Sequence, residues 1–194
     1  CAVVISGGPM SAGEEGSPAV AGEVFGLGVP VLGICYGMQF ITGFFGGIVV
    51  SGGAREYGRM SVSVEGGSEL FAGLPATFDV LMSHGDHVTS LAPGFVRTAS
   101  TSAGVAAAME DRARRIWGLQ FHPEVAHTSF GTEIISNFLF RICGCRPDWN
   151  LGGWVDKKVE EIRDDVGADR VVCGLSGGVD STVAAVLTSR AIGD

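Results

Sequence analysis

The stretch that most constrains the fold of this chain is Gly33-Ile34-Cys35-Tyr36-Gly37-Met38-Gln39. It joins Val29–Ile34, whose apolar character is typical of a buried strand, to Tyr36–Phe45, where apolar residues recur at helical spacing. A sharp turn from strand to helix leaves no room for side chains beside its central residue, so glycines flank that residue. The sequence therefore predicts a turn that presents the Cys35 thiol above the end of a strand.

The first part of the chain alternates between strand-like and helix-like segments. Predicted strands are Ala2–Ile5, Val29–Ile34, Met60–Val64, Phe78–Met82, Val96–Ala99, Val105–Met109 and Ile116–Phe121. Predicted helices are Ala19–Leu27, Tyr36–Phe45 and Phe130–Ile142, and Ser83–His87 is expected to be a polar loop. This alternation predicts an α/β fold in which helices flank an open, mostly parallel sheet. The 31 glycines suit the many strand-to-helix turns of such a fold.

A second region begins after a change in composition near Cys145–Asn150. We expect a first domain over residues 1–145, a linker over 146–153 and a second domain starting at 154–194. An amphipathic helix over Trp154–Val166, a strand over Arg170–Leu175 and a helix over Thr182–Ile192 would form the first βα unit of a second α/β domain. Because the chain starts within a strand pattern at Cys1 and stops at the close of a helical one, we expect it to be a fragment.

Composition disfavours several classes of function. The net charge is −8, from 13 basic and 21 acidic residues, so phosphate-backbone binding and a nucleic-acid partner are not expected. No apolar stretch approaches the roughly 20 residues of a membrane-spanning helix, and no signal peptide is visible. The five cysteines show no disulfide framework, and Cys143 and Cys145 lack the partners of a zinc site. A reduced, cytoplasmic protein is the simplest interpretation.

Cys35 has a candidate base and a candidate orienting group. His122 follows the predicted strand Ile116–Phe121, whose carboxyl end should lie at the same sheet edge as Cys35, and Glu124 is placed to orient its imidazole. The start of a helix favours a thiolate, and the amide of Tyr36 would face an oxyanion forming on a substrate carbonyl. Taken singly, these residues leave another interpretation open, namely a buried core cysteine and ordinary loop side chains.

Two further segments carry polar groups. His84 and Asp86 would either bind a polar substrate or hydrogen-bond each other, and the sequence leaves both open. The loop Ser176–Ser181, between the predicted strand and helix of the second region, offers backbone amides, hydroxyls and a helix N-terminus to an anion. It lacks the Gly-Lys-Ser/Thr ending of a Walker A loop. Asp180 fits an anion site only if it holds Mg²⁺ against phosphates, and an ordinary glycine-rich turn is the alternative.

Residues 1 to about 145 resemble a class I glutamine amidotransferase domain, through Gly33–Gln39 as its nucleophile motif and Gln120–Glu124 as its His/Glu motif. The resemblance implies that Cys35 attacks the glutamine carboxamide, that His122 relays a proton to the leaving ammonia and that Glu124 orients His122. Ser6–Pro9 resembles the oxyanion loop of the family, which implies that the Gly8 amide joins that of Tyr36. The positions implied to contact glutamine are Gln39, Ser83, His84, Gly85 and Asp86.

The second region resembles the pyrophosphate loop of N-type ATP pyrophosphatases, which implies ATP contacts by Ser176, Gly177, Gly178, Val179, Asp180, Ser181 and Thr182. The order of the two regions resembles the GMP synthetase family, as do Arg55–Gly58 and Met82–Asp86. This resemblance implies use of ATP with Mg²⁺ to aminate xanthosine monophosphate, at a site outside this chain, in a homodimeric complete enzyme. It also implies that a first strand and helix are missing before Cys1.

Three alternatives remain open from the sequence. Another cysteine-dependent amidase or hydrolase would share the Cys35 turn but have no use for Ser176–Ser181. The amidotransferase of a different ATP-pyrophosphatase synthetase would have both the Cys35 turn and the loop Ser176–Ser181. Glutamine-dependent NAD synthetase shares this loop but resembles a different amidase domain. A non-catalytic module that only docks a partner would need neither thiol reactivity nor a base.

Overall fold

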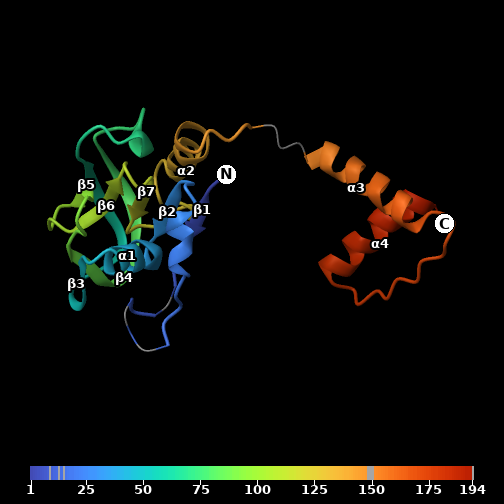
Figure 1. Ribbon diagram of the computed structural model, residues 1–194, viewed down its shortest axis with the longest axis horizontal. Coiled ribbons are helices and arrows are strands. Elements are labelled where there is room, and N and C mark those ends of the chain that lie inside the picture. Colours follow the sequence, from blue (N-terminus) through green and yellow to red (C-terminus); the bar gives the residue numbers. More distant parts are fainter. Residues whose placement is uncertain (9, 13, 15, 148–150, 194) are drawn as a thin grey trace. The chain divides into compact units, whose positions relative to one another are not determined.

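The computed structural model describes the chain except residues 9, 13, 15, 148–150 and 194, and except the side chains of residues 53–55 and 151. The chain divides into two compact units, Cys1–Cys145 and Arg146–Asp194 (Figure 1). Within the expected linker, residues 148–150 lie outside the described residues, and helix α3 already begins at Leu151. The two units are described separately below.

The first unit is built on a seven-stranded sheet in the order β1-β2-β7-β6-β5-β3-β4. The strands are β1 (Val3–Ile5), β2 (Val31–Ile34), β3 (Ile48–Val64), β4 (Thr77–Ser90), β5 (Val96–Thr101), β6 (Ala106–Asp111) and β7 (Ile116–Leu119). Flanking helices complete an α/β fold, as predicted. The sheet is mixed, however, and not mostly parallel as expected: parallel pairing is confined to β1, β2 and β7, and the other pairs are antiparallel. Parallel neighbours need a crossover connection, whereas short turns join β5, β6 and β7.

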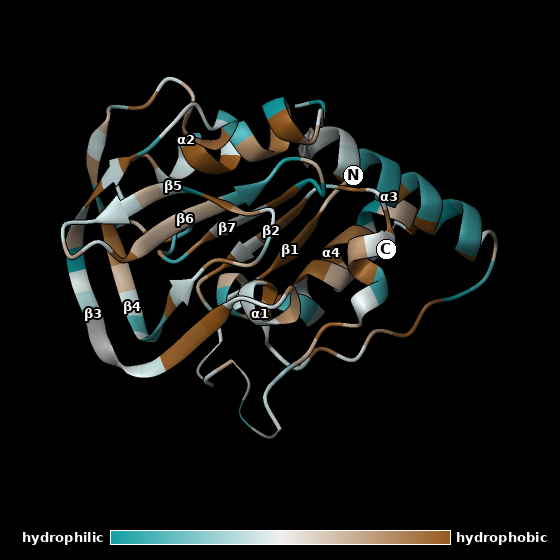
Figure 2. Ribbon diagram, turned by 60° about the vertical axis from the view of Figure 1, so that its left-hand side comes forward, coloured by the Kyte–Doolittle hydropathy of each residue, from teal (hydrophilic) through white to brown (hydrophobic). Residues whose placement is uncertain are grey.

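Helices cover both faces of this sheet. Helix α1 (Tyr36–Phe44) lies against one face, and α2 (Gly131–Ser136) with its π-helical continuation η3 (Asn137–Ile142) lies against the other (Figure 2). Alternate residues of β2 and β7 supply the two apolar cores: Leu32 and Trp117 face α2, whereas Val31 and Ile116 face α1. The sheet end that carries Cys35 is therefore fixed from both sides.

Two local predictions differ from the structure of the first unit. The helix expected at Ala19–Leu27 is reduced to the 3₁₀ turn η1 (Gly22–Gly26), because its glycines lower helix propensity and none of its residues is buried. A second 3₁₀ turn, η2, spans Glu69–Phe71.

The polar loop expected at Ser83–His87 is instead the continuation of β4, paired with β3. The strand persists because every second side chain points inward, including His84 and Asp86. The alternation of apolar residues that predicts the strand Phe78–Met82 stops before His84 and Asp86. Because these two side chains are polar, the sequence pattern does not indicate a buried strand there. Apart from Gln39, the residues expected to contact glutamine therefore lie on a paired strand.

The second unit contains α3 (Leu151–Val166) and α4 (Val179–Ile192). The Arg163 side chain of α3 donates a hydrogen bond to the Ala191 carbonyl of α4 at 2.9 Å. Arg170–Leu175, expected as a strand, is not one, and the described part of this unit offers no strand with which it would pair. Val172 is 98% exposed, so this segment has no core of its own here. Within the described residues, no helix has the length and apolar character needed to cross a membrane.

Candidate active site

Cys35 occupies the turn between β2 and α1 with a strained backbone, φ 51° and ψ −105°. Its amide donates to the Leu119 carbonyl at 2.7 Å, which ties the turn to β7. The flanking glycines are required by close approach: a Cβ on Gly37 would lie 2.1 Å from the Ile5 carbonyl oxygen, and one on Gly33 would lie 2.6 Å from the Gly37 carbonyl. The strand-to-helix turn inferred from the sequence is thus present, with its central thiol at the N-terminus of α1.

His122 lies beside Cys35, just beyond the end of β7. Its Nδ1 is 2.6 Å from Oε1 of Glu124, and its ring hydrogen-bonds the Cys35 thiol. The hydrogen bond with Cys35, and then the contact with Glu124, raise the pKa of His122 to about 9 against the opposing effect of burial. A protonated imidazole beside the sulfur favours the thiolate form. The three residues therefore form a Cys-His-Glu arrangement.

The turn that carries His122 is held by Thr128, to which sequence reasoning assigns no role. The Thr128 hydroxyl donates to the His122 carbonyl at 2.6 Å and accepts from the Leu81 amide at 3.0 Å. Gly131, at the start of α2, approaches this turn so closely that a Cβ there would lie 2.0 Å from the Pro123 carbonyl oxygen. The imidazole is thus positioned by β4 and α2 together.

The segment after β1 passes over the same thiol. A Cβ on Gly7 would lie 2.9 Å from Cε1 of His122, and one on Gly8 would lie 3.5 Å from the Tyr36 ring. The Tyr36 hydroxyl donates a hydrogen bond to the Pro18 carbonyl, which holds the chain beyond this segment. Pro9, the last residue of the predicted oxyanion loop, lies outside the described residues. The two predicted oxyanion donors, Gly8 and Tyr36, are therefore neighbours next to Cys35.

A pocket of about 720 Å³ opens above Cys35. Its lining includes Gly8, Cys35 and His122 together with every residue expected to contact glutamine: Gln39, Ser83, His84, Gly85 and Asp86. Glu124 and Tyr36 are not among the lining residues. The structure adds further lining residues that sequence reasoning gives no role: Met10, Ser11, Glu14, Ser51, Gly52 and Tyr57. Strand β3 brings the last three to the pocket, because it pairs with β4 along Ser83–Asp86.

Asp86 and His84 take different roles in this pocket. His84 is buried; its Nδ1 donates to the Asp86 backbone carbonyl at 2.8 Å and its Nε2 lies 3.2 Å from Glu56. Burial lowers the pKa of His84, although both contacts oppose that shift. Oδ2 of Asp86 is buried and has no hydrogen-bond partner among the described residues. The two residues thus meet through the Asp86 backbone carbonyl, and both line the pocket above Cys35.

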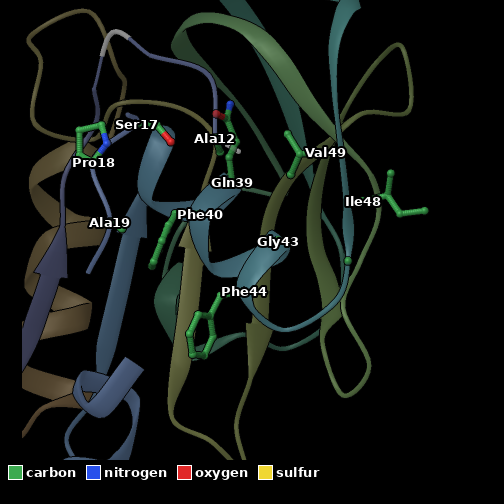
Figure 3. A pocket seen from close by; sticks show the side chains of 11 residues that line it. Ala12, Ser17, Pro18, Ala19, Gln39, Phe40, Gly43, Phe44, Ile48 and Val49 are labelled. Atoms are coloured by element: carbon green, nitrogen blue, oxygen red, sulfur yellow. The ribbon is translucent and has the colours of Figure 1, made fainter. Parts of the chain in front are cut away.

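A second pocket, of about 450 Å³, lies on the far side of Gln39 (Figure 3). Phe40 and Phe44 of α1 and Ile48 and Val49 of β3 dominate its lining. None of the described residues that line it is ionisable, so it offers nothing to pair with the charges of an amino acid. Of these two pockets, the one above Cys35 is therefore the better site for a charged amino acid.

In the second unit, the predicted phosphate loop Ser176–Thr182 leads into α4 at Val179 and is largely exposed. Ser181 Oγ lies 3.0 Å from Ser176 Oγ, and the Thr182 hydroxyl donates to the Gly178 carbonyl at 2.8 Å. Asp180 lies in the first turn of α4. No group of three or more potential metal ligands occurs among the described residues, so Asp180 fits a Mg²⁺ ion only as one carboxylate beside nucleotide phosphates.

Residues 1–142 match the model of the family described as "Glutamine amidotransferase class-I". The chain belongs to this family. Residues 151–194 match a second model, "NAD synthase". The predicted class I amidotransferase resemblance is therefore confirmed for the first unit.

Curated relatives agree with the predicted order of the two regions. The chain is 50% identical to the glutamine-hydrolysing GMP synthase of Caldicellulosiruptor saccharolyticus over 191 residues, which cover 98% of this chain and 37% of that protein. It is 50% identical over 192 residues to that of Carboxydothermus hydrogenoformans, covering 99% and 38%. The chain thus spans less than two fifths of these relatives. The predicted resemblance to GMP synthetases is confirmed.

Solved structures show the same fold. The crystal structure of a proposed GMP synthase component from Thermoplasma acidophilum is 35% identical with a TM-score of 0.63, covering 74% of this chain and 72% of that one. A glutamine amidotransferase from Thermotoga maritima is 20% identical with a TM-score of 0.50, covering 88% and 64%. At that identity the second structure supports the fold alone.

Proposed function

We propose that the first unit hydrolyses glutamine, and that the ammonia aminates xanthosine monophosphate to GMP in a complete enzyme whose ATP site begins in the second unit. One observation carries the proposal: the Cys35–His122–Glu124 arrangement opens into a pocket that contains a buried, unpartnered carboxylate oxygen of Asp86. A pocket with a thiolate at one point and an anion at another suits a substrate that has both an electrophilic carbonyl and an ammonium group.

In the proposed reaction the Cys35 thiolate attacks the carboxamide carbon of glutamine. The carbonyl oxygen becomes an oxyanion that accepts hydrogen bonds from the backbone amides of Gly8 and Tyr36. Protonated His122 gives its proton to the amide nitrogen as the C–N bond breaks, which releases ammonia and leaves a thioester on Cys35. Water then attacks the thioester with His122 as the base, and glutamate leaves. Glu124 keeps the imidazole oriented through its 2.6 Å contact with Nδ1.

Glutamine recognition falls to β4 and α1. Oδ2 of Asp86 would accept from the α-ammonium group, since a buried carboxylate oxygen without a partner carries a desolvation cost that a cation would relieve. Gln39, Ser83, His84 and Gly85 complete the wall around the substrate. Burial lowers the pKa of His84, which disfavours a second positive charge beside the ammonium group.

The second unit would contribute to ATP binding through the loop of Ser176, Gly177, Gly178, Val179, Asp180, Ser181 and Thr182. Amides and hydroxyls there suit phosphate oxygens, and Asp180 would reach a Mg²⁺ ion held by those phosphates. The xanthosine monophosphate site belongs to the part of the relatives that this chain does not span. A cytoplasmic homodimer without a nucleic-acid partner is the assembly we propose for the complete enzyme.

The test uses the full-length polypeptide, with GMP and glutamate measured separately. Cys35→Ala should abolish glutamine-driven GMP formation while ammonium chloride still supports it. Equal loss of the ammonia-driven reaction would overturn the proposed separation of the two sites. Hydrolysis of peptides in preference to glutamine would indicate another cysteine hydrolase, and ATP-dependent amination of an acceptor other than xanthosine monophosphate would indicate a different synthetase.

A further inference from the structure

Gln120 lies directly beneath the Cys35 sulfur and is fully buried, at 0% exposure. Its Nε2 is 3.8 Å from Cys35 Sγ, within hydrogen-bonding range for sulfur, and its Oε1 is 3.3 Å from Nε2 of Gln39. It follows β7 directly, and its backbone amide donates to the Ala107 carbonyl at 2.9 Å. A long polar side chain thus occupies an interior position where burial favours an apolar one, and the proposed chemistry gives it no role.

The contacts of Gln39 fix which end of the Gln120 amide meets the sulfur. The Asp86 carbonyl can only accept, so the Gln39 atom 3.0 Å from it must be the NH₂ group. The second hydrogen of that NH₂ group points to Gln120, which must therefore offer its oxygen. The Gln120 nitrogen then faces Cys35. Figure 3 shows the Gln39 side chain directed away from those of Phe40 and Phe44.

The same Asp86 carbonyl also accepts from His84, whose other nitrogen lies 3.2 Å from Glu56. A buried chain of hydrogen bonds therefore runs from His84 through the Asp86 carbonyl, Gln39 and Gln120 to the sulfur. The side-chain amides of Gln39 and Gln120 both have hydrogen-bond partners in this chain. Neither amide can therefore rotate without leaving a buried polar group unpaired.

The sulfur has two opposed contacts on its buried side. The Ser83 carbonyl, 3.8 Å away, can only accept, so it favours the protonated thiol. The Gln120 N–H can only donate, so its contact strengthens when the sulfur is negatively charged. As Cys35 loses its proton to His122, the contact with Ser83 weakens and that with Gln120 strengthens.

We propose that Gln120 is a positioning residue that holds the Cys35 sulfur and stabilises its thiolate form, with Gln39 fixing the orientation of its amide. This inference rests on the proposed function, since it concerns the same nucleophile. It predicts that the intrinsic reactivity of Cys35, and not only glutamine turnover, depends on the buried amide.

The experiment measures alkylation of the 194-residue chain by iodoacetamide between pH 5 and 9, with the label on each cysteine quantified by peptide mass spectrometry. The variants are Gln120→Met, which keeps the volume but removes the donor, and Gln120→Glu, which places a carboxylate against the sulfur. Exposed Cys173, in the other unit, is the internal reference in every sample. Circular dichroism establishes that each variant folds.

For Gln120→Met we expect the pH profile of Cys35 alkylation to be displaced upward by about one unit, so that alkylation is about tenfold slower on the acid limb of the profile, with Cys173 unchanged. Gln120→Glu should displace the profile further. Gln39→Leu leaves Gln120 in place but removes the donor that fixes the orientation of its amide. It should displace the profile less, in the same direction, and it provides the test if the Gln120 variants do not fold.

Folded variants with the wild-type pH profile at Cys35 would overturn the inference while leaving the proposed function intact. Wild-type Cys35 no more reactive than Cys173 would instead overturn the nucleophile itself, and this inference with it. A rate loss in Gln120→Met without any displacement of the profile would reduce Gln120 to a packing residue and also contradict the inference.

Discussion

Among its described residues, the first unit contains two histidine–carboxylate pairs, which differ in burial and in the direction in which the histidine pKa is shifted. His122 pairs with Glu124 at 2.6 Å, and the Glu124 side chain is 45% exposed. His84 pairs with Glu56 at 3.2 Å, and both side chains are at most 5% exposed. The pKa of His122 is raised to about 9, whereas the pKa of His84 is lowered.

The difference shows that a neighbouring carboxylate does not decide the charge of a histidine. At His122 the hydrogen bond with Cys35 is the largest influence, and it exceeds the effect of partial burial. At His84 burial is the largest influence, and it outweighs both Glu56 and the Asp86 carbonyl. One pair is therefore suited to moving protons, whereas the other is suited to holding strand β4 beside the pocket.

The largest expected effect is a difference in glutamine hydrolysis between variants of His122 and variants of His84. His122→Asn should lower glutamine hydrolysis by the full-length enzyme by about 10²- to 10⁴-fold, because it removes the proposed general acid and base. His84→Asn should act mainly through KM, because His84 shapes the wall and transfers no proton in the proposed reaction. Steady-state release of glutamate measures both, and a kcat loss at His84 as large as that at His122 would contradict the division of roles.

The sequence reveals the pair beside Cys35 far better than the buried one. Cys35, His122 and Glu124 lie in or next to sharp turns, where glycine and proline signal the backbone and short spacing predicts proximity. Glu56 and His84 are 28 residues apart and meet only because β3 and β4 pair in one particular register. Their polar side chains also hide the strand that contains them, so Ser83–His87 is predicted as a loop. Long-range pairing of this kind has no local signal in one sequence.

The second unit shows the same limit for a different reason. Amphipathic spacing predicts helix α3, and the Gly-Gly turn predicts the start of α4 within a few residues. The β-branched run Arg170–Leu175 has strand propensity, yet propensity gives a strand only where a partner strand is available. Sequence patterns of helices are local, whereas those of strands depend on neighbours elsewhere in the chain.

The next largest effect is a difference in the free energy of unfolding between variants of Glu56 and variants of Glu124. Glu56→Ala should lower the free energy of unfolding by about 1–3 kcal/mol, since it leaves the buried Thr101 hydroxyl without its acceptor and removes the carboxylate beside Nε2 of His84. Glu124→Ala should cost less than about 1 kcal/mol, because its pair is half exposed. Urea unfolding followed by Trp117 fluorescence, with the other two tryptophans replaced by phenylalanine, measures the first unit alone. Equal costs would contradict the contrast in burial.

The pH dependence of stability should divide between the same two histidines. The pKa of His122 is higher in the folded state, about 9 against 6.5, so its contribution is complete below pH 6.5 and is lost as the pH rises toward 9. The pKa of His84 is lower in the folded state, so its contribution is complete above pH 6.5 and is lost as the pH falls below that value. Urea midpoints between pH 5.5 and 8.5 should decline at both ends of this range. His122→Asn should flatten only the alkaline decline and His84→Asn only the acid one; a variant that flattens the opposite end would refute the assignment.

The smallest effect concerns the charge of Glu124. Glu124→Gln keeps an oxygen that accepts from Nδ1 of His122 but removes the carboxylate, which ranks below the hydrogen bond with Cys35 among the influences on the pKa of His122. Exposed ion pairs contribute about 0.2–1 kcal/mol, so glutamine hydrolysis should fall by no more than about fivefold. The fall should be smaller in 0.5 M salt, because salt screens the ion pair of the wild type. Glu124→Ala, which removes the acceptor as well, should be slower than Glu124→Gln. A hundredfold loss in Glu124→Gln would mean that the carboxylate charge itself drives proton transfer. The difference between His122 and His84 would then come from their carboxylate partners and not from the Cys35 contact and burial.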